Sequence, residues 1–426
     1  MMTMITVVFV SCYAMIALEH PIKINKSAIA LIAAGLMWTL YSFASPLGVH
    51  HVVEQLTEKL AETAAIVFFL ICAMTIVEVT DSHGGFEVIT SRIKATRLST
   101  LLWIIGFIAF FLSSILDNMT TTIVMVALMK RLLKHHNQRL FFAGIIVIAA
   151  NAGGAWTPIG DVTTTMLWIG GQVTTTNIME ATFLASMVSM VVPLVIASFM
   201  LRGDVVAPAR AEQEGTETTQ FEKTAMFFMG MGSLIFVPIF KAVTHLPPYL
   251  GILLALGVVW LVGDILHRHK SEEEKKHFTL SKALKRIDMA SVVFFIGILL
   301  AVATLSANGM LPALAQWLDV KVGNQGLIVV IIGLVSAIVD NIPLVAASMG
   351  MYPLTQFPSD SFLWEFMAYC AGTGGSILII GSAAGVAAMG LEKIEFFWYA
   401  RRIGPLALAG YFCGIATYIF QYRLMH

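Results

Sequence analysis

Residues 113–118 read SSILDN and residues 336–341 read SAIVDN, so a serine, an isoleucine, an aspartate and an asparagine recur in the same order. About 35 residues further on, each copy is followed by a glycine-broken apolar segment, AANAGGAWTPIGD at 149–161 and CAGTGGSILIIGS at 370–382. Two motifs that recur in the same order, at nearly one offset, indicate an internal repeat. We therefore expect the two halves of the chain to share one architecture.

The composition indicates that this architecture is built for a lipid bilayer. Of the 426 residues, 58% are hydrophobic and only 12% are charged, whereas soluble domains carry roughly 25% charged residues. A membrane-spanning helix needs about 20 predominantly apolar residues. Apolar runs lie at 2–18, 27–44, 63–79, 98–133, 138–170, 173–201, 224–240, 247–264, 289–305, 326–356, 361–389 and 404–421. The sequence therefore predicts an all-α integral membrane protein with about 10 transmembrane helices. The first run lacks a basic start and a small-residue cleavage site, which favours a membrane helix over a signal peptide.

Four of these runs are interrupted by polar residues or glycines. The runs at 98–133 and 326–356 are too long for one crossing and contain the two SSILDN-type motifs. We expect each to form a re-entrant hairpin, because irregular backbone at membrane depth is tolerated where protein surrounds it. The runs at 138–170 and 361–389 contain the glycine motifs, and we expect each to form a broken helix.

The lysines and arginines predict the orientation of these segments. Cytoplasmic loops are enriched in basic residues, and the loops on both sides of the first hairpin are basic, so this hairpin enters and leaves on the cytoplasmic side. With that parity, both termini lie outside, and so do only four basic residues: Lys59, Lys241, Lys321 and Arg423. The second hairpin then enters from the outside, and residues 1–223 and 224–426 form an inverted-topology repeat. The charged segment 265–288 is predicted to be a cytoplasmic linker, and the amphipathic residues 51–62 predict a helix at the membrane surface.

Three aspartates fall at the tips and breaks of the interrupted segments, namely Asp117, Asp161 and Asp340. A charged side chain at the bilayer centre costs roughly 2.5–3.5 kcal/mol on insertion scales, so three acids at this depth indicate a function. Carboxylate, amide and hydroxyl oxygens, with the carbonyl groups freed where a helix breaks, suit a small hard cation. Aspartate and asparagine at hairpin tips, here Asn118 and Asn341, can also serve only as helix caps, and the glycines can serve only close helix packing.

Several other classes of protein are disfavoured. The chain contains neither a Walker A sequence nor an H-E-x-x-H motif, so it is not predicted to be an enzyme. Its 26 basic and 26 acidic residues cancel, which provides no net field to attract nucleic acid. The four cysteines lie apart in apolar segments and predict neither a disulfide framework nor a metal cluster. No cofactor is expected.

The chain resembles the NhaD-type sodium–proton antiporters of the arsenite/citrate-type ion transporter superfamily. The resemblance covers nearly the whole chain and is carried by SSILDNMTTT, NAGGAWTPIGDVTTT, SAIVDNIP and GTGGS, which begin at residues 113, 151, 336 and 372. It implies a multi-pass protein of the bacterial inner membrane that supports salt tolerance and pH homeostasis, and a homodimer. The ion- and proton-binding positions that it implies are Ser113, Asp117, Asn118, Asn151, Asp161, Thr163, Thr164, Ser336, Asp340, Asn341, Ser376 and Ser382.

The function implied by this resemblance is the exchange of cytoplasmic Na⁺ or Li⁺ for external H⁺ by competition at the buried aspartates. We expect Na⁺ at the two hairpin tips, at Asp117, Asn118, Asp340 and Asn341. Related sodium-coupled carboxylate transporters carry Ser-Asn-Thr at both tips, and an aspartate in place of serine adds a proton acceptor. Two alternatives on the same fold remain open: a sodium-coupled carboxylate or other anion transporter, and a metalloid efflux carrier.

Overall fold

A computed structural model gives the structure of the protein and describes residues 2–17, 19–90, 93, 95–201, 203–205, 218–268 and 280–425. In these ranges the chain forms helices and no β-strand; one isolated bridge joins Arg97 to Asp204. The first half contains α1 (Met2–Ala17), α2 (Glu19–Ile22), α3 (Lys26–Ala44), α4 (Gly48–Ser82), α5 (Glu87–Thr90), α6 (Leu98–Ser113), α7 (Asn118–Leu132), α8 (His136–Ala155), α9 (Val162–Ile169) and α10 (Thr175–Met200). The second half contains α11 (Gln220–Thr244), α12 (Pro248–His267), α14 (Leu280–Arg286), α15 (Met289–Ala307), α16 (Met310–Val322), α17 (Gln325–Val335), α18 (Asn341–Met351), α19 (Phe362–Gly374), α20 (Ala383–Glu392), α21 (Phe396–Arg402) and α22 (Gly404–Met425). The predicted all-α fold is confirmed.

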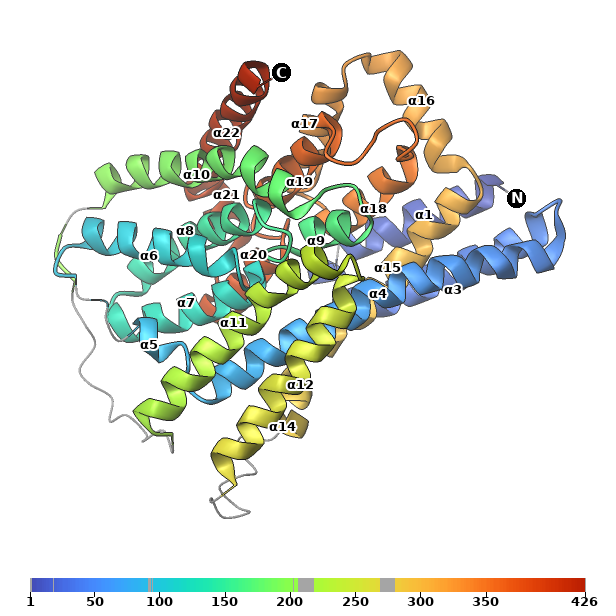
Figure 1. The fold of residues 1–426 in the computed structure, drawn as a ribbon. Helices are drawn as coiled ribbons and strands as arrows, with labels where there is room; N and C mark the ends of the chain where they lie inside the picture. Colours follow the sequence, from blue (N-terminus) through green and yellow to red (C-terminus); the bar gives the residue numbers. More distant parts are fainter. Residues whose placement is uncertain are drawn as a thin grey trace.

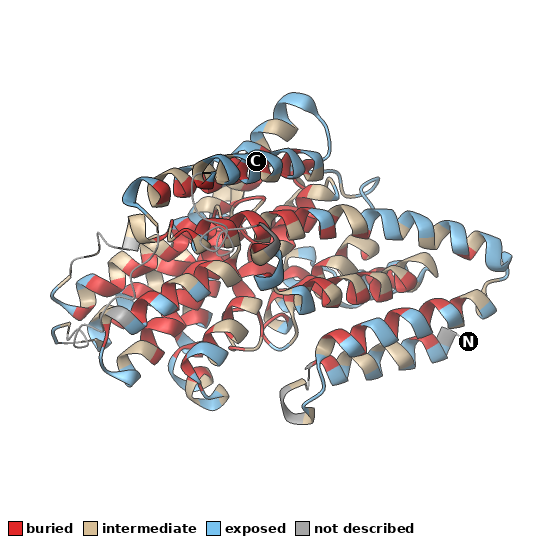
Figure 2. Ribbon diagram, turned by 90° about the horizontal axis from the view of Figure 1, so that it is seen from below, coloured by how far each residue is buried: buried red, intermediate tan, exposed pale blue. Residues whose placement is uncertain are grey.

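The helices have the length and apolar character of a multi-pass membrane protein. Within the described ranges, seven helices are long and apolar enough to cross a membrane, or up to nine if each of two bent pairs forms one span. The bent pairs are α16 with α17, at 115°, and α21 with α22, at 48°. Large apolar side chains such as Phe199 and Val243 are 75% exposed, which is expected where lipid, and not water, surrounds a helix. In Figure 2 the buried positions gather in the middle of the molecule, and the exposed ones lie at its margins.

All four interrupted segments are broken where the motifs occur. The first hairpin consists of α6 and α7, and the second consists of α17 and α18 (Figure 1). The two glycine-broken segments form the pairs α8–α9 and α19–α20. Each of the four following helices begins after a polar residue whose side chain accepts a hydrogen bond from the backbone of the first turn; these caps are Asp117, Asp161, Asp340 and Ser382. Polar caps therefore define where the second helix of each pair starts.

Glycines allow the backbones of these pairs to touch. A Cβ atom added to Gly153 would lie 2.1 Å from the carbonyl oxygen of Phe110, and one added to Gly374 would lie 2.0 Å from that of Gly333. These approaches pack α8 against α6 and α19 against α17 at corresponding positions of the two motifs. The glycines at these positions therefore do serve close helix packing.

The structure changes two details of the predicted topology. Residues 51–62 do not form a separate surface helix; they are continuous with the following span in the 35-residue helix α4, because no glycine or proline separates them from it. Helix α16 occupies a segment that contains no predicted span. Of the predicted linker 265–288, residues 269–279 lie outside the described residues.

Candidate ion-binding site

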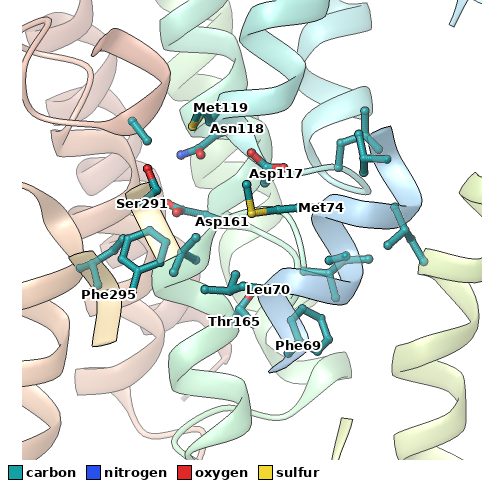
Figure 3. Close-up of a pocket in the computed structure, with 18 of the residues that line it drawn as sticks. Phe69, Leu70, Met74, Asp117, Asn118, Met119, Asp161, Thr165, Ser291 and Phe295 are labelled. Carbon is teal, nitrogen blue, oxygen red and sulfur yellow. The ribbon is translucent and has the colours of Figure 1, made fainter. Parts of the chain in front are cut away.

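The hairpin tips and one helix break meet at a small internal cavity (Figure 3). Its volume is about 60 Å³, and because one water needs roughly 10–15 Å³, it has room for a cation with a few waters. The wall on the α4 side is apolar and includes Phe69, Leu70 and Met74, and α15 adds Phe295. Most of the remaining lining is also apolar, but six polar side chains line the cavity as well: Asp117, Asn118, Asp161, Thr165, Ser291 and Asn341.

Asp117 is the acid of the first hairpin tip, and among the described residues its carboxylate accepts hydrogen bonds only from neutral groups of its own turn. Thr120 donates its backbone N–H to Oδ1 at 2.8 Å and its hydroxyl to Oδ2 at 2.5 Å. No described lysine, arginine or histidine forms an ion pair with Asp117. A carboxylate that faces a cavity and is not paired with a basic side chain can act as a ligand for a cation that enters the cavity.

Asp161 joins the two halves of the protein. It is 2% exposed, and Thr163 donates to it with its backbone N–H at 3.3 Å and its hydroxyl at 3.0 Å. The side-chain amide of Asn341, from the second hairpin tip, also donates to Asp161 at 3.4 Å. Asp161 and Asp117 line the same cavity, so a bound cation or proton reduces the repulsion between these two carboxylates when both are ionised.

Asn151 connects the first hairpin tip to the second glycine-broken segment. It is fully buried, and its Oδ1 accepts a hydrogen bond from Asn118 at 2.9 Å. Its Nδ2 donates to the hydroxyls of Ser376 and Ser382, both at 2.9 Å. This network brings four of the predicted site residues together. Of the four, Asn118 lines the cavity, and the other three do not.

Asp340 does not line the cavity and has a cationic partner. Its Oδ2 lies 3.2 Å from the Nζ of Lys26, and its Oδ1 accepts a hydrogen bond from the backbone of Ile342 at 3.3 Å. The distribution of lysines and arginines predicts that Lys26 lies in a cytoplasmic loop, but in the structure Lys26 contacts the second hairpin tip. Nothing in the local sequence indicates this contact, because 314 positions separate the two residues.

Two other predicted site residues, Ser113 and Ser336, hold the backbone in place. Ser113 donates its hydroxyl to the carbonyl oxygen of Ala150 at 2.7 Å, and Ser336 donates to that of Ala371 at 3.2 Å. These two bonds join each hairpin to the glycine-broken helix of the same half. Thr164 is buried without a hydrogen-bond partner for its hydroxyl and does not reach the cavity. Sequence analysis missed Thr165, which lies four residues after Asp161 and therefore on the same face of α9.

Comparisons with known proteins agree with this architecture. Residues 13–372 match the protein family described as citrate transporter. The chain is 50% identical over 417 residues to Sodium/proton antiporter 1 of Arabidopsis thaliana, which covers 97% of this chain and 71% of that protein. It is 30% identical over 441 residues to the Na(+)/H(+) antiporter NhaD of Vibrio cholerae, which covers 97% of this chain and 90% of that protein.

A solved structure has a similar fold. The crystal structure of the Alcanivorax borkumensis YdaH transporter aligns with a TM-score of 0.59 at 11% identity, over 93% of this chain and 98% of that chain. At this level of identity the likeness concerns the fold alone, while the sequence matches identify the family. Both hairpin tips lie within the matched residues 13–372. The chain therefore belongs to the citrate transporter family and, within it, to the NhaD-type sodium–proton antiporters.

Proposed function

We propose that this protein is a secondary active antiporter that exchanges cytoplasmic Na⁺ or Li⁺ for external H⁺. The observation that carries the proposal is the pair of carboxylates at the cavity. Asp117 and Asp161 both line it, and neither has an ion-pair partner among the described residues. Relatives that are 50% and 30% identical to this chain are named as sodium–proton antiporters, which supports the same ions for this chain.

In the proposed cycle, Na⁺ and H⁺ compete for these carboxylates. The deprotonated acids bind Na⁺ with the amide oxygens of Asn118 and Asn341, and protonation releases it on the other side of the membrane. Of the four tip residues expected to bind Na⁺, Asp340 alone does not line the cavity. We therefore propose that Asp340 influences Na⁺ binding through its negative charge and not as a ligand. Asn151, Ser376 and Ser382 orient Asn118 from behind.

The moving parts in this proposal are the hairpins and broken helices of an inverted repeat, residues 1–223 and 224–426. The matching glycine contacts of α8 with α6 and of α19 with α17 support the repeat. A homodimer is proposed from the resemblance to the superfamily alone. We also propose the bacterial inner membrane, with roles in salt tolerance and pH homeostasis; because the relatives include plant proteins, membrane fractionation of the native host tests this location.

A carboxylate carrier is the alternative to test, since the family is described as citrate transporter. A citrate anion would meet two carboxylates at the cavity, and like charges repel one another. In inverted vesicles from antiporter-deficient bacteria, a fluorescent pH probe should report proton movement when Na⁺ or Li⁺ is added without any organic acid. Proton or Na⁺ movement that occurs only after citrate is added would support the carrier and contradict the antiporter.

Direct competition has a further consequence for the same assay. Because one site binds either ion, raising the proton concentration should weaken apparent Na⁺ affinity by up to about tenfold per pH unit in the range where the site titrates. Exchange should be measured over a series of Na⁺ concentrations from mildly acidic to alkaline pH. An apparent Na⁺ affinity that is the same throughout would exclude competition at shared carboxylates.

A further inference from the structure

The two hairpin tips carry the same motif but differ in their electrostatic partners. Asp117 and Asp340 are both the N-cap of the second hairpin helix. Asp117 is hydrogen-bonded by Thr120 and faces the cavity. Asp340 instead forms an ion pair with Lys26. The repeat therefore has a cationic side chain at one tip and, among the described residues, none at the other.

The structure holds Lys26 firmly in this position. It begins α3, where Asn25 caps the helix by accepting a hydrogen bond from the backbone of Ser27. The hydroxyl of Ser27 donates to the carbonyl oxygen of Ala290 at 2.8 Å and so fixes the start of α3 beside α15. The Lys26 ammonium also lies 4.5 Å from the centre of the Phe294 ring, whose face attracts cations.

The contact between Lys26 and Asp340 is not an ordinary surface ion pair. The side chains are only 22% and 11% exposed, respectively, so water screens their attraction weakly. Removing one partner of such a pair leaves the other charge uncompensated at depth. The ammonium is thus the monovalent cation that neutralises Asp340, as Na⁺ would neutralise Asp117.

We propose that Lys26 is a resident cation that fills the second of two symmetry-related cation positions, so that each chain binds a single Na⁺ or Li⁺, at the cavity of Asp117 and Asp161. This inference rests on the proposed antiport function and specifies how many ions the site takes. It explains why Asp340 pairs with Lys26 and does not line the cavity although it repeats Asp117. Lys26 does not contact the transported ion in this proposal; it neutralises and positions Asp340.

Equilibrium binding of radioactive sodium to purified protein at alkaline pH tests this proposal, because the readout counts ions and does not depend on transport. The wild type should bind one Na⁺ per chain. Lys26→Met removes the resident charge and roughly keeps the length of the side chain, so Asp340 should accept a second Na⁺ and the amount bound at saturation should rise from one to two Na⁺ per chain. Lys26→Arg keeps the cation and should bind one Na⁺.

The double variant Lys26→Met/Asp340→Asn is the matched control, because it removes both charges of the pair and should again bind one Na⁺. Gel filtration establishes that each variant is folded. Two Na⁺ per wild-type chain would overturn the proposal even if Lys26→Met fails to fold. A folded Lys26→Met protein that binds one Na⁺ would also overturn it, while Na⁺-driven exchange by the wild type would leave the proposed function intact. A wild type that neither binds Na⁺ nor exchanges it would contradict the proposed function itself.

Discussion

Asp117 has two roles in the structure, and both depend on its carboxylate. It caps α7 by accepting hydrogen bonds from Thr120, and it presents negative charge to the cavity. A cap needs an oxygen acceptor but no charge, and asparagine caps helices about as well as aspartate does. The two roles therefore respond differently to substitution.

We expect Asp117→Asn to abolish Na⁺-driven proton movement with little change in thermal stability, because the cap remains and the charge is lost. Asp117→Ala should lose both and be less stable by about 0.5–2 kcal/mol. Asp117→Glu keeps the charge and should shift the pH profile of exchange. Vesicle assays and thermal unfolding in detergent measure the two effects separately. Wild-type exchange by Asp117→Asn would show that Asp117 is only a cap.

Glycines determine how the broken segments pack as elements. Gly153 lets α8 touch the backbone of α6, and Gly374 lets α19 touch that of α17. Ser113 and Ser336 add a hydrogen bond at each of these crossings. At these two crossings the hairpins touch the broken helices backbone to backbone, which leaves no room for a side chain on the glycines.

Gly153→Ala and Gly374→Ala should each destabilise the protein by about 1–3 kcal/mol, the usual cost of overpacking a well-packed interior. The clash is with a backbone carbonyl oxygen, so no side-chain rotation relieves it. Gly35→Ala is the control, because a Cβ atom there meets nothing within 4 Å and alanine favours a helix interior. If all three variants unfold at the same temperature in detergent, close packing does not explain these glycines.

The orientation of the whole molecule follows from the distribution of charge along the chain. The loops before α6 and after α7 carry clustered basic residues, and in Figure 1 the start of α6 and the end of α7 lie at the same end of this hairpin. The positive-inside rule then assigns that end to the cytoplasm. The two repeats are inverted relative to each other only if both ends of the first hairpin lie on the cytoplasmic side.

Single cysteines at Thr96 and Lys134, introduced into a background without the four native cysteines, test the orientation. Both positions are exposed, and both should be protected from an impermeant thiol reagent in intact cells but labelled after the membrane is opened. Lys321→Cys, predicted to lie outside, is the control that should be labelled in intact cells. Labelling of only one of the two loop positions would contradict the hairpin.

The sequence by itself determined the membrane class of the protein and the places where four of its apolar segments break, but it did not predict α16 or the length of α4. These features depend on runs of apolar residues and on local signals such as a capping aspartate or a glycine, which act over a few residues. The motifs also singled out Asp117, Asn118, Asp161 and Asn341, which line the cavity.

Only the tertiary structure decided which predicted residues reach the cavity and what partners they meet there. Asn151 touches serines 225 and 231 positions away, and Lys26 meets Asp340 from the opposite half of the chain. Hydrophobic periodicity shows which face of a helix is apolar but does not show which helix packs against that face. Long-range pairs of this kind depend on how the helices cross, and that is set by the close packing of the whole molecule.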